Sequence, residues 1–464
     1  MTVRGLLAIG FLSASVGIAQ VAAAQTEATD IYAAFKEKPA NDAQASENAA
    51  SGETVAIAIQ SALRHNPRVD IANAQLDAAR AERLRAFGRF LPEIEASAAY
   101  TNDDLRSSTL QTLQDRDGAT VGVTASQPIF QGLSALNRYR EARARLTQSD
   151  FALLAALQET ALDAARAHAA VILARAIVEH RIENLNLVTR QFQITERRMK
   201  AGAQSRTGVE QARMRRAQTQ VDLAQARAVL AEREAAYERI IGHAPPPDLV
   251  QNNDEEVVSF SSLDEAQTVA LENNPSLNAA RQAVKAVEYA KSAAKGDFAP
   301  SLALEGSYFR RFGEDTLLAP QQDEEYQLVA RMRMPIFQQG RNIAGLRSAG
   351  ATVTEQRGQM TNTQLGVTEA VARSWRQFIE VRTRRVAAEG GIDAAALSVK
   401  GLQIEYEAGQ RTVIDVLDGQ RDLVTAYINL SQAEHDYFVA QYDLASATGL
   451  ILDYAGEMAS AEND

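Results

Sequence analysis

Two carboxylates near the C-terminal end of the chain are the side chains most suggestive of a site. Asp415 and Asp418 are three residues apart, so on a helix they share one face. Carboxylates gathered on a face can attract cations, above all when several copies of a chain bring them to one axis. A structural role competes, because Thr412-x-x-Asp415 fits a helix-capping box. Asp418 lies outside that cap and is therefore the better indicator of an ion site.

Apart from these two carboxylates, the sequence contains no pattern of reactive residues that is typical of an enzyme. The histidines have no metal-ligand spacing, and the sequence contains no phosphate-binding loop, metalloprotease motif or nucleophile elbow. The five histidines are His65, His168, His180, His243 and His435. The chain has no cysteine, which excludes disulfides, thiolate metal sites and a lipidated N-terminal cysteine. We therefore expect no catalytic residue, metal or cofactor, and the net charge of −11 argues against nucleic acid as a partner.

Long helices must position the two carboxylates. The stretch from Leu136 to Met199 has neither proline nor glycine, and at 1.5 Å per residue it predicts a helix of about 100 Å. Apolar residues recur in it every seven positions, at Leu157, Ala164, Val171, Val178, Leu185, Phe192 and Met199. The same spacing returns near the C-terminus, at Val416, Leu423, Leu430, Tyr437 and Leu444. A strict seven-residue repeat predicts coiled-coil packing.

Two segments change to a period of two, which is typical of strands. In the first, Ile94, Ala96, Ala98 and Tyr100 alternate with Glu93, Glu95, Ser97 and Thr101, and the second has Leu302, Leu304, Gly306 and Tyr308 in the same positions. Each segment is followed by a second alternating run after a polar loop, predicted at residues 103–118 and 312–324. Such strands match a transmembrane β-barrel, although one segment alone fits a half-buried soluble sheet equally well.

The chain is duplicated. Gln127-Pro128-Ile129-Phe130-Gln131 returns about 207 residues later as Met334-Pro335-Ile336-Phe337-Gln338, and Ala201-Gly202 returns as Ala408-Gly409. Several anchors in one order indicate two copies of one unit. We place repeat 1 at residues 53–242, a linker at 243–262, repeat 2 at 263–449 and a tail at 450–464. Each repeat should contain a helix broken near an Asn-Pro pair, two strands and a long helical hairpin.

The N-terminus predicts export. Residues 1–24 have a basic start at Arg4, an apolar run and the small residues Ala22-Ala23-Ala24, which together are typical of a secretory signal peptide. Residues 25–52 read as a loosely ordered lead-in. Four strands cannot close a barrel in lipid, since about eight are the minimum. The chain is therefore expected to form a homotrimer, in which three copies supply twelve strands and a helical tube beneath them.

These features resemble the TolC-like outer membrane efflux proteins, and the resemblance covers essentially all of the mature chain. Its most specific part is Tyr406-Glu407-Ala408-Gly409-Gln410-Arg411-Thr412-Val413-Ile414-Asp415-Val416-Leu417-Asp418, which looks like the family's second periplasmic tip. At the first tip Gly208 stands where the second has Asp415. The fold implied is mainly α with a transmembrane β-barrel portion, an internally duplicated trimeric channel-tunnel in outer membrane lipid with its helices in the periplasm.

The resemblance also implies partners and residue roles. The protein would be a passive exit duct coupled to an inner-membrane transporter through a periplasmic adaptor, serving type I protein secretion, drug efflux or both. The turns at Ala201, Gly202, Ala408 and Gly409 would contact those partners. Asp415 and Asp418 would ring the periplasmic aperture, and Tyr406 and Arg411 would tether the closed tip. The alternative is a periplasmic coiled-coil adaptor or scaffold, which usually has one helical hairpin rather than two hairpins and two strand pairs.

Overall fold

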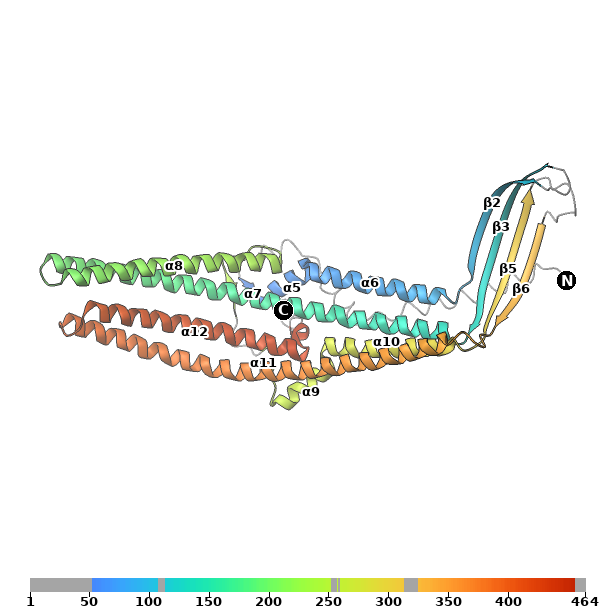
Figure 1. The fold of residues 1–464 in the computed structure, drawn as a ribbon. Coiled ribbons are helices and arrows are strands. Elements are labelled where there is room, and N and C mark those ends of the chain that lie inside the picture. The colour runs from blue at the N-terminus through green and yellow to red at the C-terminus, as the bar shows by residue number, and fades with distance from the viewer. Residues whose placement is uncertain (1–51, 107–112, 252–256, 258, 313–323, 455–464) are drawn as a thin grey trace. The chain divides into compact units, whose positions relative to one another are not determined.

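The computed structural model describes residues 52–106, 113–251, 257, 259–312 and 324–454. The expected signal peptide, almost all of the lead-in and most of the tail lie outside these residues. Figure 1 labels the elements. The first half contains α5 (Val55–His65), α6 (Pro67–Gly88), β2 (Glu93–Arg106), β3 (Leu113–Gln131), α7 (Ser134–Lys200) and α8 (Arg206–Ile241). The second contains α9 (Leu263–Asn273), α10 (Pro275–Gly296), β5 (Ser301–Phe312), β6 (Glu324–Arg333), α11 (Arg341–Glu407) and α12 (Val413–Thr448).

The two halves thus repeat the same elements in the same order. Corresponding helices also have equal lengths, since α7 and α11 each contain 67 residues, and α8 and α12 each contain 36 residues. As expected from their Asn-Pro pairs, α5 ends before Asn66 and α9 before Asn274, because proline disfavours helix at the residue before it. Two short strands, β1 (Glu53–Thr54) and β4 (Leu249–Val250), pair in parallel outside the repeated elements.

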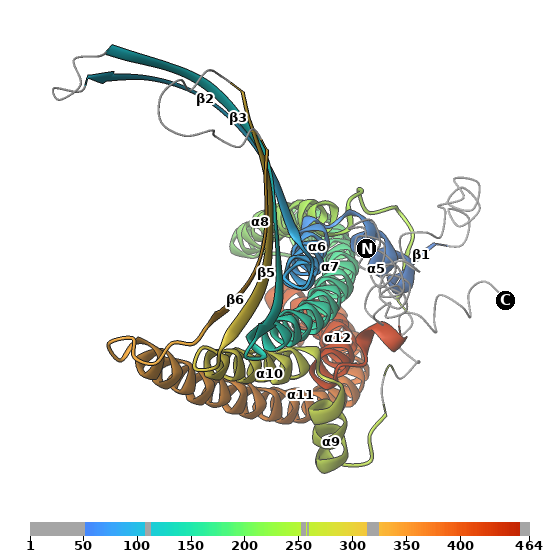
Figure 2. The same cartoon turned by 90° about the vertical axis from the view of Figure 1, so that its right-hand side faces the viewer.

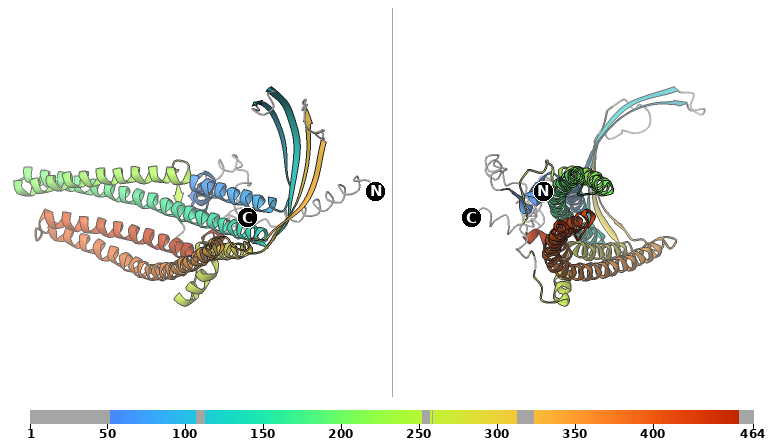
Figure 3. Two further views of the ribbon diagram at one scale, coloured as in Figure 1. Left: turned by 45° about the vertical axis from the view of Figure 1, so that its right-hand side comes forward. Right: turned by 90° about the vertical axis from the view of Figure 1, so that its left-hand side faces the viewer.

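The chain forms two compact units, and the larger contains the helical hairpins. Its described residues lie within 52–73, 150–278 and 363–454, and in it α8 runs back along α7 and α12 runs back along α11 (Figures 1 and 3). Fully buried Leu157, Ala164 and Val171 follow the predicted seven-residue repeat. None of the helices in the described part of the chain combines the length and the hydropathy of a membrane span.

The smaller unit, residues 74–149 and 279–362, contains one sheet. Its antiparallel strands lie in the order β2-β3-β5-β6, so β2 and β6 form the two edges (Figure 2). The loop predicted at residues 103–118 is too long. Strands β2 and β3 remain paired as far as Arg106 and Leu113, because the ladder is formed by backbone groups that polar side chains do not interrupt. In the second strand pair, β5 ends at Phe312 and β6 begins at Glu324, as predicted.

The two faces of this sheet differ in polarity. Residues opposite each other in the register share a face, and every second residue along a strand returns to it. One face carries Ile94, Ala96, Ala98, Tyr100, Val121, Val123, Leu304, Tyr308, Tyr326, Leu328 and Met332, with the ion pair of Arg310 and Glu324 at its hairpin end. The other carries Glu93, Glu95, Ser97, Thr124, Ser126, Glu305, Ser307, Arg311, Gln327, Arg331 and Arg333. The apolar face is largely exposed, with Tyr326 and Leu328 both at 74%.

Candidate aperture and docking tips

The ends of the two hairpins have the same backbone turn. Gly202 and Gly409 both adopt a φ of +76°, the left-handed conformation that closes a helix and favours glycine. In the first turn the Gly202 N–H donates to the Met199 carbonyl at 2.9 Å, and in the second the Gly409 N–H donates to the Tyr406 carbonyl at 3.0 Å. Each repeat therefore uses its Ala-Gly pair to end one long helix before the chain reverses.

The next helices begin with different caps. Element α12 has the predicted capping box, in which the Thr412 N–H donates to the Asp415 carboxylate at 2.8 Å and the Asp415 N–H donates back to the Thr412 hydroxyl at 3.4 Å. Thr207-x-x-Glu210 at the first tip also fits a capping box in sequence, but these residues do not form the cap of α8. Ser205 caps α8 by accepting from the Gly208 N–H, because the helix begins at Arg206, before Thr207.

Asp415 is held as a carboxylate by this cap. The Thr412 hydroxyl donates to it at 2.7 Å, in addition to the bond from the Thr412 N–H. These hydrogen bonds, together with the positive charge of Arg411 nearby, lower the pKa of Asp415 below its usual value. Its negative charge consequently persists at any pH near neutrality.

Asp418 faces the other hairpin. It forms an ion pair with Arg215 of α8, a residue 203 positions earlier in the sequence, and lies 3.8 Å from Arg421 on its own helix. The side chain of Arg215 is 20% exposed and that of Asp418 is 42% exposed, so water screens this pair only in part. Sequence reasoning missed Arg215, because nothing local connects two residues so far apart.

Tyr406 lies in an apolar cluster that joins the two hairpins. The cluster comprises Val188, Phe192, Val209, Ala212, Tyr406, Val413, Val416 and Leu417, from α7, α8, α11 and α12. The guanidinium of Arg198 on α7 stands 4.8 Å from the centre of the tyrosine ring, within the range of a cation–π contact. The tyrosine hydroxyl is buried without a hydrogen-bond partner among the described residues. The ring therefore makes the contact between hairpins.

Arg411 bonds within its own turn. Its guanidinium donates to Glu405 at 2.8 Å, and this hydrogen bond raises the pKa of Arg411. The structure thus places Arg411 beside Asp415 at the surface of the tip and Tyr406 in the core beneath it. The tips also differ in charge, since residues 196–210 have four basic and two acidic side chains, whereas residues 405–418 have four acidic side chains and Arg411.

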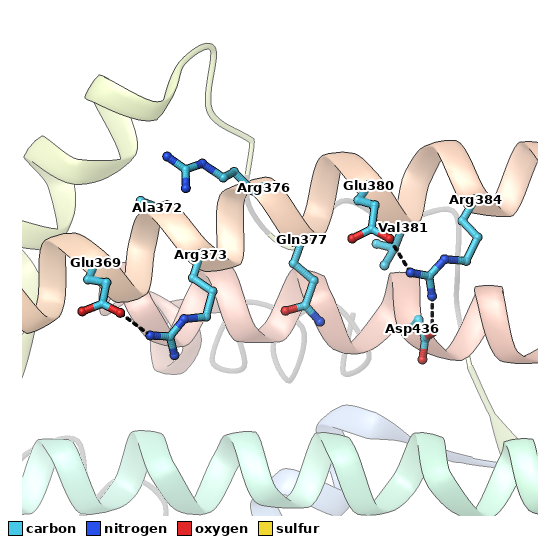
Figure 4. Close-up of a pocket in the computed structure, with 9 residues that line it drawn as sticks. All are labelled: Glu369, Ala372, Arg373, Arg376, Gln377, Glu380, Val381, Arg384 and Asp436. Carbon is cyan, nitrogen blue, oxygen red and sulfur yellow. Dashed lines mark hydrogen bonds and ion pairs between the residues drawn. The ribbon is translucent and has the colours of Figure 1, made fainter.

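A hollow of about 690 Å³ lies farther along the second hairpin, between α11 and α12. Five of its six charged side chains pair with one another, with Glu369 bonded to Arg373, and Glu380 and Asp436 bonded to Arg384, while Arg376 bonds to none of them (Figure 4). These are exposed pairs between residues of helix surfaces, which contribute little stability and leave no reactive group poised over the hollow.

His168 is packed among the helices and does not face solvent. It is fully buried, and its Nε2 lies 3.1 Å from the Val250 carbonyl, which requires the tautomer with the proton on Nε2. Burial lowers the pKa of His168 to about 4, and the charge of Arg175 acts in the same direction. Within the described residues, no group of three or more His, Asp or Glu side chains is arranged to hold a metal ion.

Two long helical hairpins and a shared four-stranded sheet, built by the two halves of a duplicated chain, define a TolC-like channel fold. The chain belongs to the outer membrane efflux protein family, whose model matches residues 58–243 and 268–450.

Known proteins agree with this assignment. The chain is 28% identical to the outer membrane efflux protein BepC of Brucella suis over 403 residues, 86% of each chain. It is 26% identical to the alkaline protease secretion protein AprF of Pseudomonas aeruginosa over 416 residues, 86% of this chain and 85% of that protein. The CmeC outer membrane channel of Campylobacter jejuni has the same fold, with a TM-score of 0.78 at 16% identity over 89% of this chain and 90% of CmeC. The protein is thus an export channel of the outer membrane, with its helical part in the periplasm.

Proposed function

We propose that three copies of the chain close a twelve-stranded barrel and continue it as a helical tunnel, forming a passive exit duct through the outer membrane. The observation that carries this proposal is the sheet, which has an apolar face, a polar face and two unpaired edges. An open edge in lipid leaves backbone N–H and C=O groups without partners, at a cost of several kcal/mol each. Closure with further copies removes both edges.

The apolar face has the composition that contact with lipid requires. Ile94, Tyr100 and Met332 are between 67% and 69% exposed and belong to this face. The opposite face would line a water-filled lumen, since it carries the ion pair between Glu305 and Arg331. An amphipathic sheet of this kind supports a barrel with lipid outside and solvent inside.

The hairpin tips are the surfaces we assign to the periplasmic adaptor and the inner-membrane transporter. The turns at Ala201, Gly202, Ala408 and Gly409 are exposed, and no side chain of the described residues approaches the space beside either glycine. Such turns can receive a partner's backbone closely. One relative is named for efflux and another for protease secretion, and our proposal covers both classes of cargo.

The same tips would contain the gate. Asp415 and Asp418 supply acidic groups at the aperture, with the charge of Asp418 partly offset by Arg215 in the state described here. Tyr406 would hold the resting tip through its ring, and Arg411 would order the turn above it through its bond to Glu405. No step of this function requires bond chemistry, so we assign the protein no catalytic role.

The proposal is tested by the mass of the purified protein in detergent and by its conductance in a planar bilayer. We expect a trimer by light scattering that forms a cation-favouring pore. A folded monomer that needs no detergent would contradict the barrel, and a trimer that conducts no current would contradict the duct.

A further inference from the structure

The two edge strands of the sheet, β2 and β6, have counterparts in the other repeat that already pair with each other. Strand β5 is the counterpart of β2, and β6 is the counterpart of β3. The register inside the two strand pairs is the same. Glu93 pairs with Ser126, and their counterparts Ser301 and Arg333 are also directly opposite each other. The repeats therefore agree residue by residue in the sheet.

The pairing of β3 with β5 therefore predicts the register in which β6 would pair with β2 of another copy. In that pairing Ser126 lies opposite Glu305. The counterpart of Ser126 is Arg333 on β6, and the counterpart of Glu305 is Ser97 on β2. We infer that β2 of a second copy of this chain pairs with β6 in the register that sets Arg333 opposite Ser97. This inference rests on the proposed trimer and specifies the contact between its copies.

The unpaired segment after β6 supports the inference independently. In repeat 1 the residues Pro128 to Gln131 belong to β3 and pair with β5 as far as Ser301. In repeat 2 the corresponding residues 335–338 form no strand. Their apolar side chains are open to solvent, with Ile336 at 93% and Phe337 at 82% exposed, against 58% and 43% for Ile129 and Phe130. The strand of a second copy would cover them.

The same rule places the partner of this segment. Phe130 lies opposite Leu302 and Gln131 opposite Ser301. Their counterparts across the seam are Phe337 opposite Ile94 and Gln338 opposite Glu93. Strand β6 therefore extends through Gln338 when the second copy binds, which buries apolar surface and completes the backbone ladder along the edge.

Charge complementarity favours the same seam. Glu95 and Arg333 are exposed, lie on the polar face at the same end of the sheet, and have no ion pair within the part of the chain described. In the inferred register they are diagonal neighbours, because Glu95 is two residues from Ser97. Diagonal neighbours in a sheet are within reach of long side chains. Glu305 and Arg331 form an ion pair across the other diagonal, at 3.0 Å between β5 and β6, so side chains of this length do reach two residues along a neighbouring strand.

Cysteine pairs test the register cleanly, since the chain has no cysteine of its own. Within one copy, β2 and β6 are three strand spacings apart, or about 14 Å, which is beyond the reach of a disulfide of about 7 Å between Cα atoms. Oxidised Ser97→Cys with Arg333→Cys should therefore give disulfide-linked dimers and trimers on a non-reducing gel. The matched control is Ser126→Cys with Glu305→Cys, which should give an intrachain bond and no increase in mass.

The outcomes separate the register from the assembly. Trimers by light scattering that crosslink through Ala99→Cys with Arg333→Cys, and not through Ser97→Cys with Arg333→Cys, would overturn the register and leave the trimer intact. A monomer by light scattering without any interchain crosslink would overturn the trimer as well.

The charge pair is tested by exchange. Glu95→Arg should lower the temperature at which the trimer dissociates on a gel, and Glu95→Arg with Arg333→Glu should restore it. A double variant no more stable than the single one would remove Glu95 and Arg333 from the seam.

Discussion

Truncating Tyr406 should open the tip, while removing only its hydroxyl should not. The ring is 8% exposed and contacts residues of both hairpins, whereas the hydroxyl has no partner among the described residues. Replacing a buried aromatic residue by alanine costs about 3 to 5 kcal/mol, and loss of the cation–π contact with Arg198 adds about 0.5 to 1 kcal/mol. We therefore expect Tyr406→Ala to weaken the contact between the hairpins and Tyr406→Phe to leave it nearly unchanged.

The loss is large enough to shift the gate. Three protomers together lose about 9 kcal/mol or more, and about 5.5 kcal/mol suffices to move a two-state equilibrium from 1:99 to 99:1. Single-channel conductance in a planar bilayer should rise for Tyr406→Ala, and cells carrying it should become sensitive to large antibiotics. The trimer should still form, because the sheet and the rest of the long hairpins are untouched.

Tyr437 supplies a matched control. It is also buried on the second hairpin, at 7% exposed, and the guanidinium of Arg385 stands 5.2 Å from its ring centre. The buried residues of its cluster belong to α11 and α12, with Phe260 packed against them, and none of the described residues of the first hairpin belongs to it. Tyr437→Ala should lower stability by a similar amount without raising conductance. Equal opening by Tyr406→Phe, or by Tyr437→Ala, would refute the argument that the ring joins the hairpins.

Three further outcomes are expected. The pKa of His168 falls from 6.5 to about 4 on folding, so in this pH range the unfolded chain binds a proton that the native state excludes. The free energy of unfolding should therefore fall by about 3 kcal/mol as the pH drops from about 6.5 to 4. The melting temperature of His168→Gln should depend less on pH across this range than that of the wild-type protein. Asp415→Asn with Asp418→Asn should reduce the cation preference of reconstituted channels and their block by divalent ions, and an unchanged reversal potential would remove both residues from the pore. Gly132→Ala should reduce the yield of folded trimer, because Gly132 has a φ of +60° and an added Cβ would lie 2.4 Å from the Gly296 carbonyl oxygen; Gly358→Ala, at an open helical position, is the control expected to fold normally.

Local pattern accounts for the elements that the sequence predicted. The Asn-Pro pairs locate the breaks at Asn66 and Asn274, and the long stretch free of proline and glycine predicts α7 almost to the residue. Positive φ at Gly202 and Gly409 follows from a chain that must reverse between two helices. These features depend on residues close in the sequence, so one sequence with its internal duplication is sufficient to find them.

Strand lengths and helix starts were less predictable. Residues 103–106 read as a polar loop, yet the backbone ladder includes them in β2, because hairpin pairing requires no apolar side chain. Ser205 rather than Thr207 caps α8, and both types of residue can serve as caps. Boundaries of this kind depend on which of several acceptable partners the folded backbone reaches.

The sequence by itself determined the duplication, the helix and strand order, and the residues that belong at the tips. Only the tertiary structure decided what those tip residues contact. Asp418 pairs with Arg215, and Tyr406 packs beneath Arg198, across about 200 residues of chain. Helical periodicity specifies which face of a helix is apolar, but it does not specify which helix packs against that face or where along its length. The packing partners are set when the two hairpins bury their apolar surfaces against each other. In this protein that packing places the ring of Tyr406 between the two hairpins.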